Sequence, residues 1–263
     1  MRCLITGAAS GIGLAIAELA ASAEDNTLVL VDRDPTVHTV AEKLRSSTAI
    51  VADLENPQGA TDVADAATKA LGGLDVIFSN AGVMANGPLE ELTLAAFDRT
   101  FAVNTRATWL IAKAAFPELK RSRGSIVATA SISGTHPTPP AGAYSASKAA
   151  LKMLIEQLAL EWGRYGIRAN CVSPGPTDTA LTYNSFGAGS AGEAAGNRAY
   201  REALVPLRRI GKPEDVAAAA LFLADPAAQQ ITGVDLKVDG GLSLAVMPVT
   251  GRVPGFSLDA ITA

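Results

Sequence analysis

The sequence predicts a single doubly wound α/β domain in which helices flank a central seven-stranded parallel sheet. Short apolar runs alternate with longer helical patterns from the first residue to about Gly241, as they do in a parallel sheet covered by helices. A glycine-rich turn separates the first strand from the first helix. No linker, internal repeat or change of composition interrupts the 263 residues. Residues 1–263 are therefore expected to form one domain.

The expected strands are short runs rich in Val, Ile, Leu and Thr, at 2–6, 27–31, 48–51, 76–79, 125–129, 168–172 and 235–238. Helical patterns lie between them, near 13–23, 37–45, 57–71, 94–119, 143–163 and 213–223. Residues 180–205 break this rhythm, because they are too glycine-rich for a stable core helix and too long for an ordinary connection. We expect a mobile lid there, and the alternative is a loop without a role. The partly apolar tail, residues 242–263, needs a surface on which to dock.

Composition and charge restrict the classes of partner. The net charge is -4 and the pI is near 5.3, so neither nucleic acid nor an anionic membrane is an expected partner, and small molecules remain. The longest apolar run, 216–224, is far shorter than the roughly 20 residues that span a bilayer. Cys3 and Cys171 lie in separate apolar segments, which favours buried free thiols in a reducing compartment. A cytoplasmic location is expected, and no cluster of metal ligands is present in the sequence.

A phosphate-binding turn is predicted directly after the first strand. Glycines at 7, 11 and 13 allow a sharp turn that brings backbone N–H groups and a helix N-terminus against a pyrophosphate. The strand, turn and helix follow one another as the Rossmann-like dinucleotide fold requires, which leaves an ordinary glycine turn as the weaker interpretation. The residues expected to hold the dinucleotide here are Gly7, Ser10, Gly11, Ile12 and Gly13.

Asp32 ends the second strand, about twenty residues after the glycine turn, where a carboxylate can accept hydrogen bonds from both hydroxyls of an adenosine ribose. Its charge at ~4 Å from a 2′-phosphate would cost roughly 4 kcal/mol per unit charge at an effective dielectric constant of ~20. The prediction is therefore NAD rather than NADP. Arg33 is adjacent and would partly offset the repulsion. The alternative role for Asp32 is a turn cap before Pro35.

Tyr144 and Lys148 are spaced i and i+4 in a helical pattern, so that both side chains share one helix face. A phenol normally ionises near ~10, too high for proton transfer at neutral pH. An ammonium ~4 Å away contributes roughly 4 kcal/mol at a dielectric constant of ~20, enough to lower the pKa by up to ~3. We expect Tyr144 to exchange a proton with an alcohol. By itself such a pair is common on helix surfaces.

Seven motifs in order resemble the classical short-chain dehydrogenase/reductase family over essentially residues 1–241. They are Thr6-Gly7-x-x-x-Gly11-x-Gly13, Asn80-Ala81-Gly82, Asn104, Ser131, Tyr144-x-x-x-Lys148, Pro174-Gly175 and Asp239-Gly240-Gly241. The chain departs from the family pattern in three places. Ala107 stands where a glycine is common, Ala130 where many relatives have a second serine, and the tail after Gly241 is longer than the minimal family ending.

The resemblance implies a catalytic set of Asn104, Ser131, Tyr144 and Lys148. Ser131 would hold the substrate oxygen as charge develops on it, and the backbone of Asn104 would hold a water that passes protons on from Lys148. It also implies that the cofactor contacts Asp53, Leu54, Asn80, Ala81, Gly82, Tyr144, Lys148, Pro174, Gly175, Thr177 and Thr179. Asp53 has an alternative role as a helix cap, and the segment containing Thr177 and Thr179 as a proline-rich turn with threonine caps.

The implied reaction is reversible hydride transfer from a secondary alcohol to NAD, which makes the protein an NAD-dependent alcohol dehydrogenase/ketone reductase. The candidate substrate-binding residues are Ser131, Ser133, Tyr144, Met84 and Tyr183. Further expected pocket walls are Val83, Ile132, His136, Pro137, Leu181 and Phe186, which favour a hydrophobic, aromatic or steroid-like alcohol. Arg198 and Arg201 of the lid are expected to be solvated. Ser133 is more simply a loop hydroxyl, and His136 a loop histidine without a partner.

Helix 143–163 is apolar on more than one face, so part of it is expected to meet another subunit, first in a homotetramer and otherwise in a dimer. Two alternative functions remain open. One is an NADP-linked carbonyl reductase, which Asp32 argues against. The other is a non-catalytic dinucleotide-sensing module, which would usually have lost one of the four catalytic side chains.

Overall fold

The computed structural model describes residues 1–186 and 191–245. A seven-stranded sheet runs through it in the order β3-β2-β1-β4-β5-β6-β7, and each neighbouring pair is parallel. The strands are β1 (Arg2–Thr6), β2 (Thr27–Asp32), β3 (Ser47–Val51), β4 (Val76–Ser79), β5 (Ser125–Thr129), β6 (Arg168–Pro174) and β7 (Asp235–Val238). The predicted fold, a single Rossmann-like α/β domain, is confirmed.

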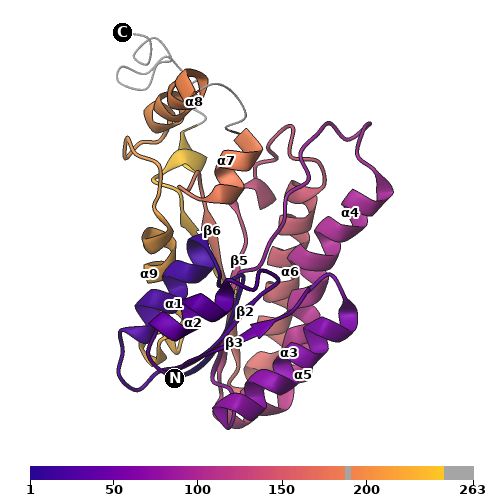
Figure 1. Cartoon of the computed structure of the whole chain (residues 1–263), viewed down its shortest axis with the longest axis vertical. Helices are drawn as coiled ribbons and strands as arrows, with labels where there is room; N and C mark the ends of the chain where they lie inside the picture. The colour runs from indigo at the N-terminus through magenta and orange to yellow at the C-terminus, as the bar shows by residue number, and fades with distance from the viewer. Residues whose placement is uncertain (187–190, 246–263) are drawn as a thin grey trace.

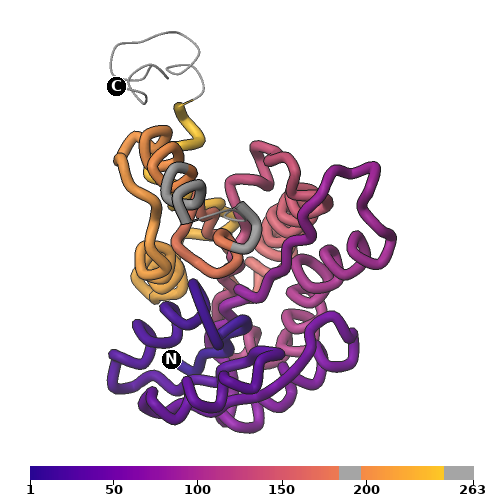
Figure 2. The backbone as a smooth tube through the Cα atoms, turned by 45° about the horizontal axis from the view of Figure 1, so that its top comes forward, coloured from indigo at the N-terminus to yellow at the C-terminus, as the bar shows by residue number. Residues whose placement is uncertain are grey.

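Helices cover both faces of the sheet (Figures 1 and 2). One apolar layer joins the sheet to α1 (Gly11–Ala21), α2 (Val37–Lys43) and α9 (Pro213–Ala224). The other joins it to α3 (Pro57–Leu71), α5 (Ala107–Ser122) and α6 (Tyr144–Trp162). The inner strands β1, β2, β4, β5 and β6 are buried on both faces, which explains their apolar runs, whereas the edge strands β3 and β7 are partly exposed. Strand order reverses between β1 and β4, where a doubly wound sheet opens a crevice at its carboxyl edge.

The helical stretch expected at 94–119 is confirmed, but a π-helical turn interrupts it, so that it consists of three parts. These are α4 (Leu94–Phe101), a π-helical turn η1 (Ala102–Arg106) and α5. Asn104 lies in the turn and is buried, and its amide binds the backbone of Val83 on a different segment. A π-turn accommodates one extra residue, and such turns are frequent at functional sites.

Residues 180–205 also differ from expectation, because most of the stretch is helical. It contains α7 (Ala180–Phe186) and α8 (Ala191–Leu204), on either side of 187–190, which lie outside the described residues. The two helices lie at the same end of the molecule (Figure 1). That this segment acts as a lid stays a prediction. Most of the predicted tail, 246–263, also lies outside the described residues, and 3₁₀ turn η5 (Leu242–Leu244) begins it.

The remaining short elements are 3₁₀ turns η2 (Ile132–Gly134), η3 (Gly163–Tyr165) and η4 (Pro226–Ala228). Cys3 and Cys171 are free and buried, as predicted. None of the helices in 1–186 and 191–245 combines the length and the hydropathy of a transmembrane span. Across the same residues, no group of three or more His, Cys, Asp or Glu side chains is arranged to hold a metal ion.

Candidate active site

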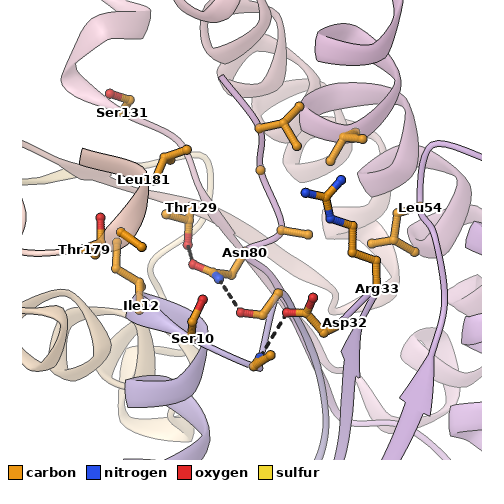
Figure 3. A pocket seen from close by; sticks show the side chains of 18 of the residues that line it. Ser10, Ile12, Asp32, Arg33, Leu54, Asn80, Thr129, Ser131, Thr179 and Leu181 are labelled. Atoms are coloured by element: carbon orange, nitrogen blue, oxygen red, sulfur yellow. Dashed lines mark hydrogen bonds between the residues drawn. The ribbon is translucent and has the colours of Figure 1, made fainter. Parts of the chain in front are cut away.

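A cleft of about 440 Å³ opens at the carboxyl edge of the sheet and receives residues from both halves of the strand order. Figure 3 shows Asp32, Arg33 and Leu54 on one side of it, and Ser131, Thr179 and Leu181 across from them. Asn80 lies between the two groups. The residues that line the cleft come from many segments of the chain, from Gly7 to Thr182.

The glycine turn lines one part of the cleft, and its glycines allow the backbone to approach neighbouring segments more closely than a residue with a Cβ atom could. Gly7 and Gly11 have φ values of 67° and 56°, which favour glycine. A Cβ atom on Gly13 would lie 2.0 Å from the Gly7 carbonyl oxygen. Gly7, Ser10, Gly11 and Ile12 line the cleft, whereas Gly13 lies behind them and lets the turn close. The turn therefore presents backbone to a ligand, as a phosphate site requires.

Asp32 joins the glycine turn to the end of β2. Its Oδ2 accepts a hydrogen bond from the Ala9 amide at 3.0 Å, and its Oδ1 accepts one from the Asp34 amide at 3.0 Å. The predicted turn cap is thus present, and the carboxylate also lines the cleft. Asp53 and Leu54 line the same end. Asp53 Oδ1 accepts from the Glu55 amide in the local turn, but the alternative role as a helix cap is wrong, because Asn56 caps α3 by accepting from the Gln58 amide.

Asn80 holds three strands together at the middle of the cleft. Its Nδ2 donates to the carbonyl oxygens of Thr6 and Gly7 at 3.3 and 3.4 Å. Its Oδ1 accepts from Thr129 Oγ1 at 3.0 Å. The side chain therefore fixes β1 with its glycine turn against β4 and β5, and Ala81 and Gly82 continue along the cleft wall.

Ser131, Tyr144 and Lys148 meet at the far end of the same cleft and are largely buried. Ser131 follows β5 and begins η2, whereas Tyr144 begins α6 and Lys148 lies one turn later. Lys148 Nζ donates to the Thr129 carbonyl oxygen at 2.7 Å and lies 5.7 Å from the centre of the Tyr144 ring. The structure thus brings together three of the four predicted catalytic side chains.

The electrostatic state of Tyr144 differs from the sequence prediction. Burial raises the pKa of its phenol, and a hydrogen bond with Ser131 opposes that rise only partly. Burial lowers the pKa of Lys148 to about 8. The expected lowering of the Tyr144 pKa by Lys148 is wrong for these residues, because desolvation penalises the phenolate and the ammonium is directed to the Thr129 carbonyl.

Asn104 supports this group from behind. Its Oδ1 accepts from the Val83 amide at 2.8 Å, and its Nδ2 donates to the Val83 carbonyl and to Ser147 Oγ, each at 2.9 Å. Ser147 Oγ in turn donates to the Tyr144 carbonyl at 2.7 Å. The side chain therefore connects the π-turn to the first turn of α6. The sequence analysis missed Ser147 and Thr129, since neither carries a signal beyond its closeness to a named residue.

The segment after β6 closes the cleft near Tyr144. Pro174, Gly175, Thr177 and Thr179 all line it. A Cβ atom on Gly175 would lie 2.7 Å from the Asp239 Cβ, so the segment packs directly on the Asp239-Gly240-Gly241 motif. The alternative role of threonine caps is also observed, because Thr179 Oγ1 accepts from the Thr182 amide at 3.3 Å.

Three predicted substrate contacts do not line the cleft: Met84, Ser133 and Tyr183. The Ser133 hydroxyl pairs with Thr138 Oγ1, and its amide donates to Ser131 Oγ. The Tyr183 hydroxyl accepts from Arg198. Met84 is half-buried beyond Val83, which does line the cleft. Their contact with a substrate stays a prediction, and the pairing of Ser133 with Thr138 agrees with the simpler interpretation of Ser133 as a loop hydroxyl.

Arg198 lies outside the cleft and is 40% exposed, as the sequence analysis expected, but it also forms ion pairs. Its guanidinium lies 3.0 Å from Asp178 Oδ2 and 3.0 Å from Glu202 Oε1. It therefore joins α8 to the segment that follows β6. The Tyr183 hydroxyl is part of the same cluster.

Comparisons with known proteins agree with this geometry. A family model described as enoyl-(acyl carrier protein) reductase matches residues 7–243. D-threitol dehydrogenase of Mycolicibacterium smegmatis is 36% identical over 250 residues, covering 92% of each chain. The chain belongs to the short-chain dehydrogenase/reductase family. Because the match spans nearly the whole chain, this short-chain dehydrogenase/reductase is an oxidoreductase.

Two solved structures show which cofactors related short-chain dehydrogenases bind. One is 3-ketoacyl-(acyl-carrier-protein) reductase from Brucella melitensis with NADH, with TM-score 0.84, 30% identity, and coverage of 92% of this chain and 97% of that one. The other, from Beutenbergia cavernae, is assigned as an NAD(P)-dependent gluconate 5-dehydrogenase with NADP at low occupancy, with TM-score 0.84, 34% identity, and coverage of 92% and 96%. The glycine turn, Asp32 and Asn80 line a cleft that fits a dinucleotide here, and the two related structures contain NADH in one case and NADP in the other.

Proposed function

We propose that the protein is an NAD-dependent oxidoreductase that interconverts a secondary alcohol and its ketone. The observation that carries the proposal is a single cleft that joins a backbone phosphate site to a buried group of Ser131, Tyr144 and Lys148. A dinucleotide that extended from the glycine turn toward Thr177 would place its reactive end beside the tyrosine. When bound, NAD supplies an acceptor for the hydride released by the carbinol carbon.

The protein's own residues would transfer the hydroxyl proton and bind the substrate oxygen. The Ser131 hydroxyl would donate a hydrogen bond to the substrate oxygen, and Tyr144 would take the hydroxyl proton during oxidation or return it during reduction. Burial raises the pKa of Tyr144, which keeps the phenol protonated at neutral pH and ready to protonate a ketone, whereas the phenolate that accepts the alcohol proton during oxidation forms only as the pH rises. Below pH about 8, Lys148 is charged, and its ammonium would offset only part of the desolvation that penalises the negative oxygen formed when Tyr144 gives up its proton.

The proposed preference for NAD over NADP rests on Asp32. Its carboxylate lines the cleft at the end of β2, where an adenosine ribose would lie, and hydrogen bonds from two backbone amides fix its position. A 2′-phosphate there would face that charge directly. Arg33 also lines the cleft and is the feature that favours the alternative, an NADP-linked carbonyl reductase.

The proposed substrate is a hydrophobic, aromatic or steroid-like alcohol. The apolar side chains that line the cleft near its catalytic end are Val83, Val103 and Leu181. We also propose a homotetramer, with a dimer as the alternative, in the cytoplasm. Leu160 and Met153 are 80% and 63% exposed on α6, which gives that helix an uncovered apolar face.

The test of this function combines cofactor binding with a substrate panel. NADH should raise the melting temperature of the protein more than NADPH does at equal concentration. A panel of secondary alcohols that includes aliphatic, aromatic and steroid members is then incubated with NAD, and formation of NADH is followed by its near-ultraviolet absorbance. We expect turnover with apolar members. Protection by NADH without turnover of any alcohol, or of the matching ketones with NADH, would indicate the non-catalytic sensing module instead.

A further inference from the structure

A mostly buried ion pair lies behind the catalytic residues and belongs to none of the roles assigned above. Lys152 lies on α6, one helical turn after Lys148. Its Nζ is 2.6 Å from Asp235 Oδ2, and each side chain is 16% exposed. The Arg2–Asp75 pair at the amino end of the sheet is more exposed, at 28% and 30%.

The carboxylate of this pair is fixed by a second strand. Asp235 is the first residue of β7, and its Oδ1 accepts a hydrogen bond from Ser173 Oγ at 2.5 Å. Ser173 lies in β6 and is fully buried. The two oxygens of Asp235 therefore have partners on different elements, so its position is set by the sheet. A charge held in this way can anchor a flexible lysine.

Lys152 also holds the turn that begins at Ser131. Its Nζ donates to Thr135 Oγ1, and Thr135 directly follows η2. The turn is closed by amide hydrogen bonds from Gly134 to Ser131 and from Thr135 to Ile132, each at 3.0 Å. Ser131 and the Lys152 contact are therefore the two ends of one short rigid unit.

This unit rests directly on the backbone of the catalytic helix. A Cβ atom on Gly134 would lie 2.9 Å from the Lys148 carbonyl carbon and 3.0 Å from the Ala149 amide nitrogen. The turn thus approaches α6 at Lys148 as closely as glycine allows, and Lys152 holds its far end one helical turn further on. Any slip of the turn would move Ser131 relative to Tyr144.

We propose that Lys152, anchored by Asp235, is a positioning residue that fixes the Ser131 turn on α6 and so sets the Ser131 hydroxyl against Tyr144. This inference rests on the proposed function, since it assigns a role to a residue of the same site. Lys152 touches neither the cleft nor the reacting atoms, and it acts only through Thr135 and the turn.

The pair has an electrostatic consequence for Lys148. The other titratable groups on the same part of α6 as Lys148 are Tyr144, Lys152 and the exposed Glu156. The titratable groups on the strands that face this part of α6 are Cys171 of β6 and Asp235 of β7.

The other neighbouring elements add little charge near Lys148. Arg106 of η1 donates to the Glu55 carbonyl oxygen, and Arg99 of α4 pairs with Glu55. No residue of η2 is titratable. Asp235 balances the charge of Lys152. Breaking the pair leaves a positive charge in one variant and a negative charge in the other, about one helical turn from Lys148.

The experiment breaks the pair from both sides. Lys152→Met removes the ammonium and keeps the side-chain length, and Asp235→Asn removes the carboxylate charge. We expect each to lower kcat by roughly tenfold with little change in NADH affinity, since small misplacements of catalytic groups have large effects. Lys152→Arg, which can still bind Asp235 and Thr135, should recover most of the activity. Arg2→Met is the matched control and should lower the melting temperature without changing kcat.

A second readout needs neither cofactor nor substrate. The Cε resonance of Lys148, assigned by its loss in Lys148→Met, is titrated by NMR in each variant. Asp235→Asn leaves Lys152 unpaired and should move the midpoint to lower pH, whereas Lys152→Met leaves Asp235 unpaired and should move it to higher pH, each by roughly half a pH unit. The double variant should return the midpoint toward that of the parent while kcat stays low.

The outcomes separate this inference from the proposed function. If the parent protein turns over and both variants keep its kcat, or if Lys152→Arg restores nothing, the positioning role is wrong. Midpoint shifts of the same sign in both single variants would also overturn it, because a general loss of packing would act in that way. If the parent turned over no alcohol or ketone at all, the proposed function would fail, whereas opposite midpoint shifts would still support the pairing of Lys152 with Asp235 beside Lys148.

Discussion

Replacing Tyr144 with phenylalanine is expected to lower kcat by two to four orders of magnitude, the usual contribution of a positioned acid or base. The substitution removes only the hydroxyl that exchanges the proton, and the aromatic ring that lines the cleft is retained. The affinity for NADH should therefore stay close to that of the parent protein. Steady-state kinetics with the best alcohol of the panel, together with NADH binding by fluorescence, measure both quantities.

The matched control is Tyr165→Phe. Tyr165 lies in η3, beyond the end of α6, where it packs against Phe116 and Lys120 away from the cleft. Loss of its hydroxyl should leave kcat unchanged. A Tyr144→Phe variant that keeps the parent's turnover would show that another group transfers the proton, and Ser131 would then be the next candidate to examine.

Replacing Asp32 with alanine is expected to raise the affinity for NADPH relative to NADH by a factor of ten or more. The carboxylate charge disfavours a 2′-phosphate, and its removal relieves that repulsion. The same substitution removes the acceptor for the Ala9 and Asp34 amides, so we also expect weaker NADH binding and a lower melting temperature. Dissociation constants for both reduced cofactors, measured by fluorescence titration, give the ratio.

Two further variants separate charge from turn geometry. Asp32→Asn removes the charge but keeps one acceptor oxygen, so it should relax the cofactor preference with a smaller loss of stability. Asp34→Ala removes a neighbouring carboxylate that lines the same cleft and accepts from the Thr36 amide, and it should change the ratio much less. If the ratio for Asp32→Ala equals that of the parent, Asp32 does not distinguish the two cofactors.

The sheet was predictable because each strand is a short run with apolar or β-branched residues and lies next to a helical pattern. All seven strands were placed within two residues of their observed ends; β6, for example, runs to Pro174 rather than to 172. The glycine turn was equally readable, since its strand, turn and helix are contiguous in sequence. Local signals of this kind do not depend on the rest of the fold.

The predictions were incomplete or wrong where tertiary contacts decide the outcome. The π-turn at 102–106 depends on the Asn104 amide reaching Val83, and helical periodicity does not show such a contact. The pKa of Tyr144 depends on burial, which outweighs the lysine one turn away. The orientations of Ser133 and Tyr183 depend on Thr138 and Arg198, which lie five and fifteen residues further along the chain.

The pair of Lys152 and Asp235 shows the same limit more clearly. The residues are far apart in sequence, and each lies in an element whose apolar pattern explains its place in the fold. Only the pairing of β7 with β6, and of both with α6, brings their charges within 2.6 Å. The contact of Lys152 with the Ser131 turn could therefore not be predicted from sequence patterns.

The most direct test of the proposed reaction follows the hydrogen of the carbinol carbon. An alcohol from the panel that is deuterated at that carbon is oxidised with NAD by the parent protein. The reduced cofactor is then isolated, and its mass is measured by mass spectrometry. We predict that one deuterium per turnover is found in the NADH, because the hydride passes directly between the two carbons in the cleft. Reduced cofactor without deuterium would contradict direct hydride transfer.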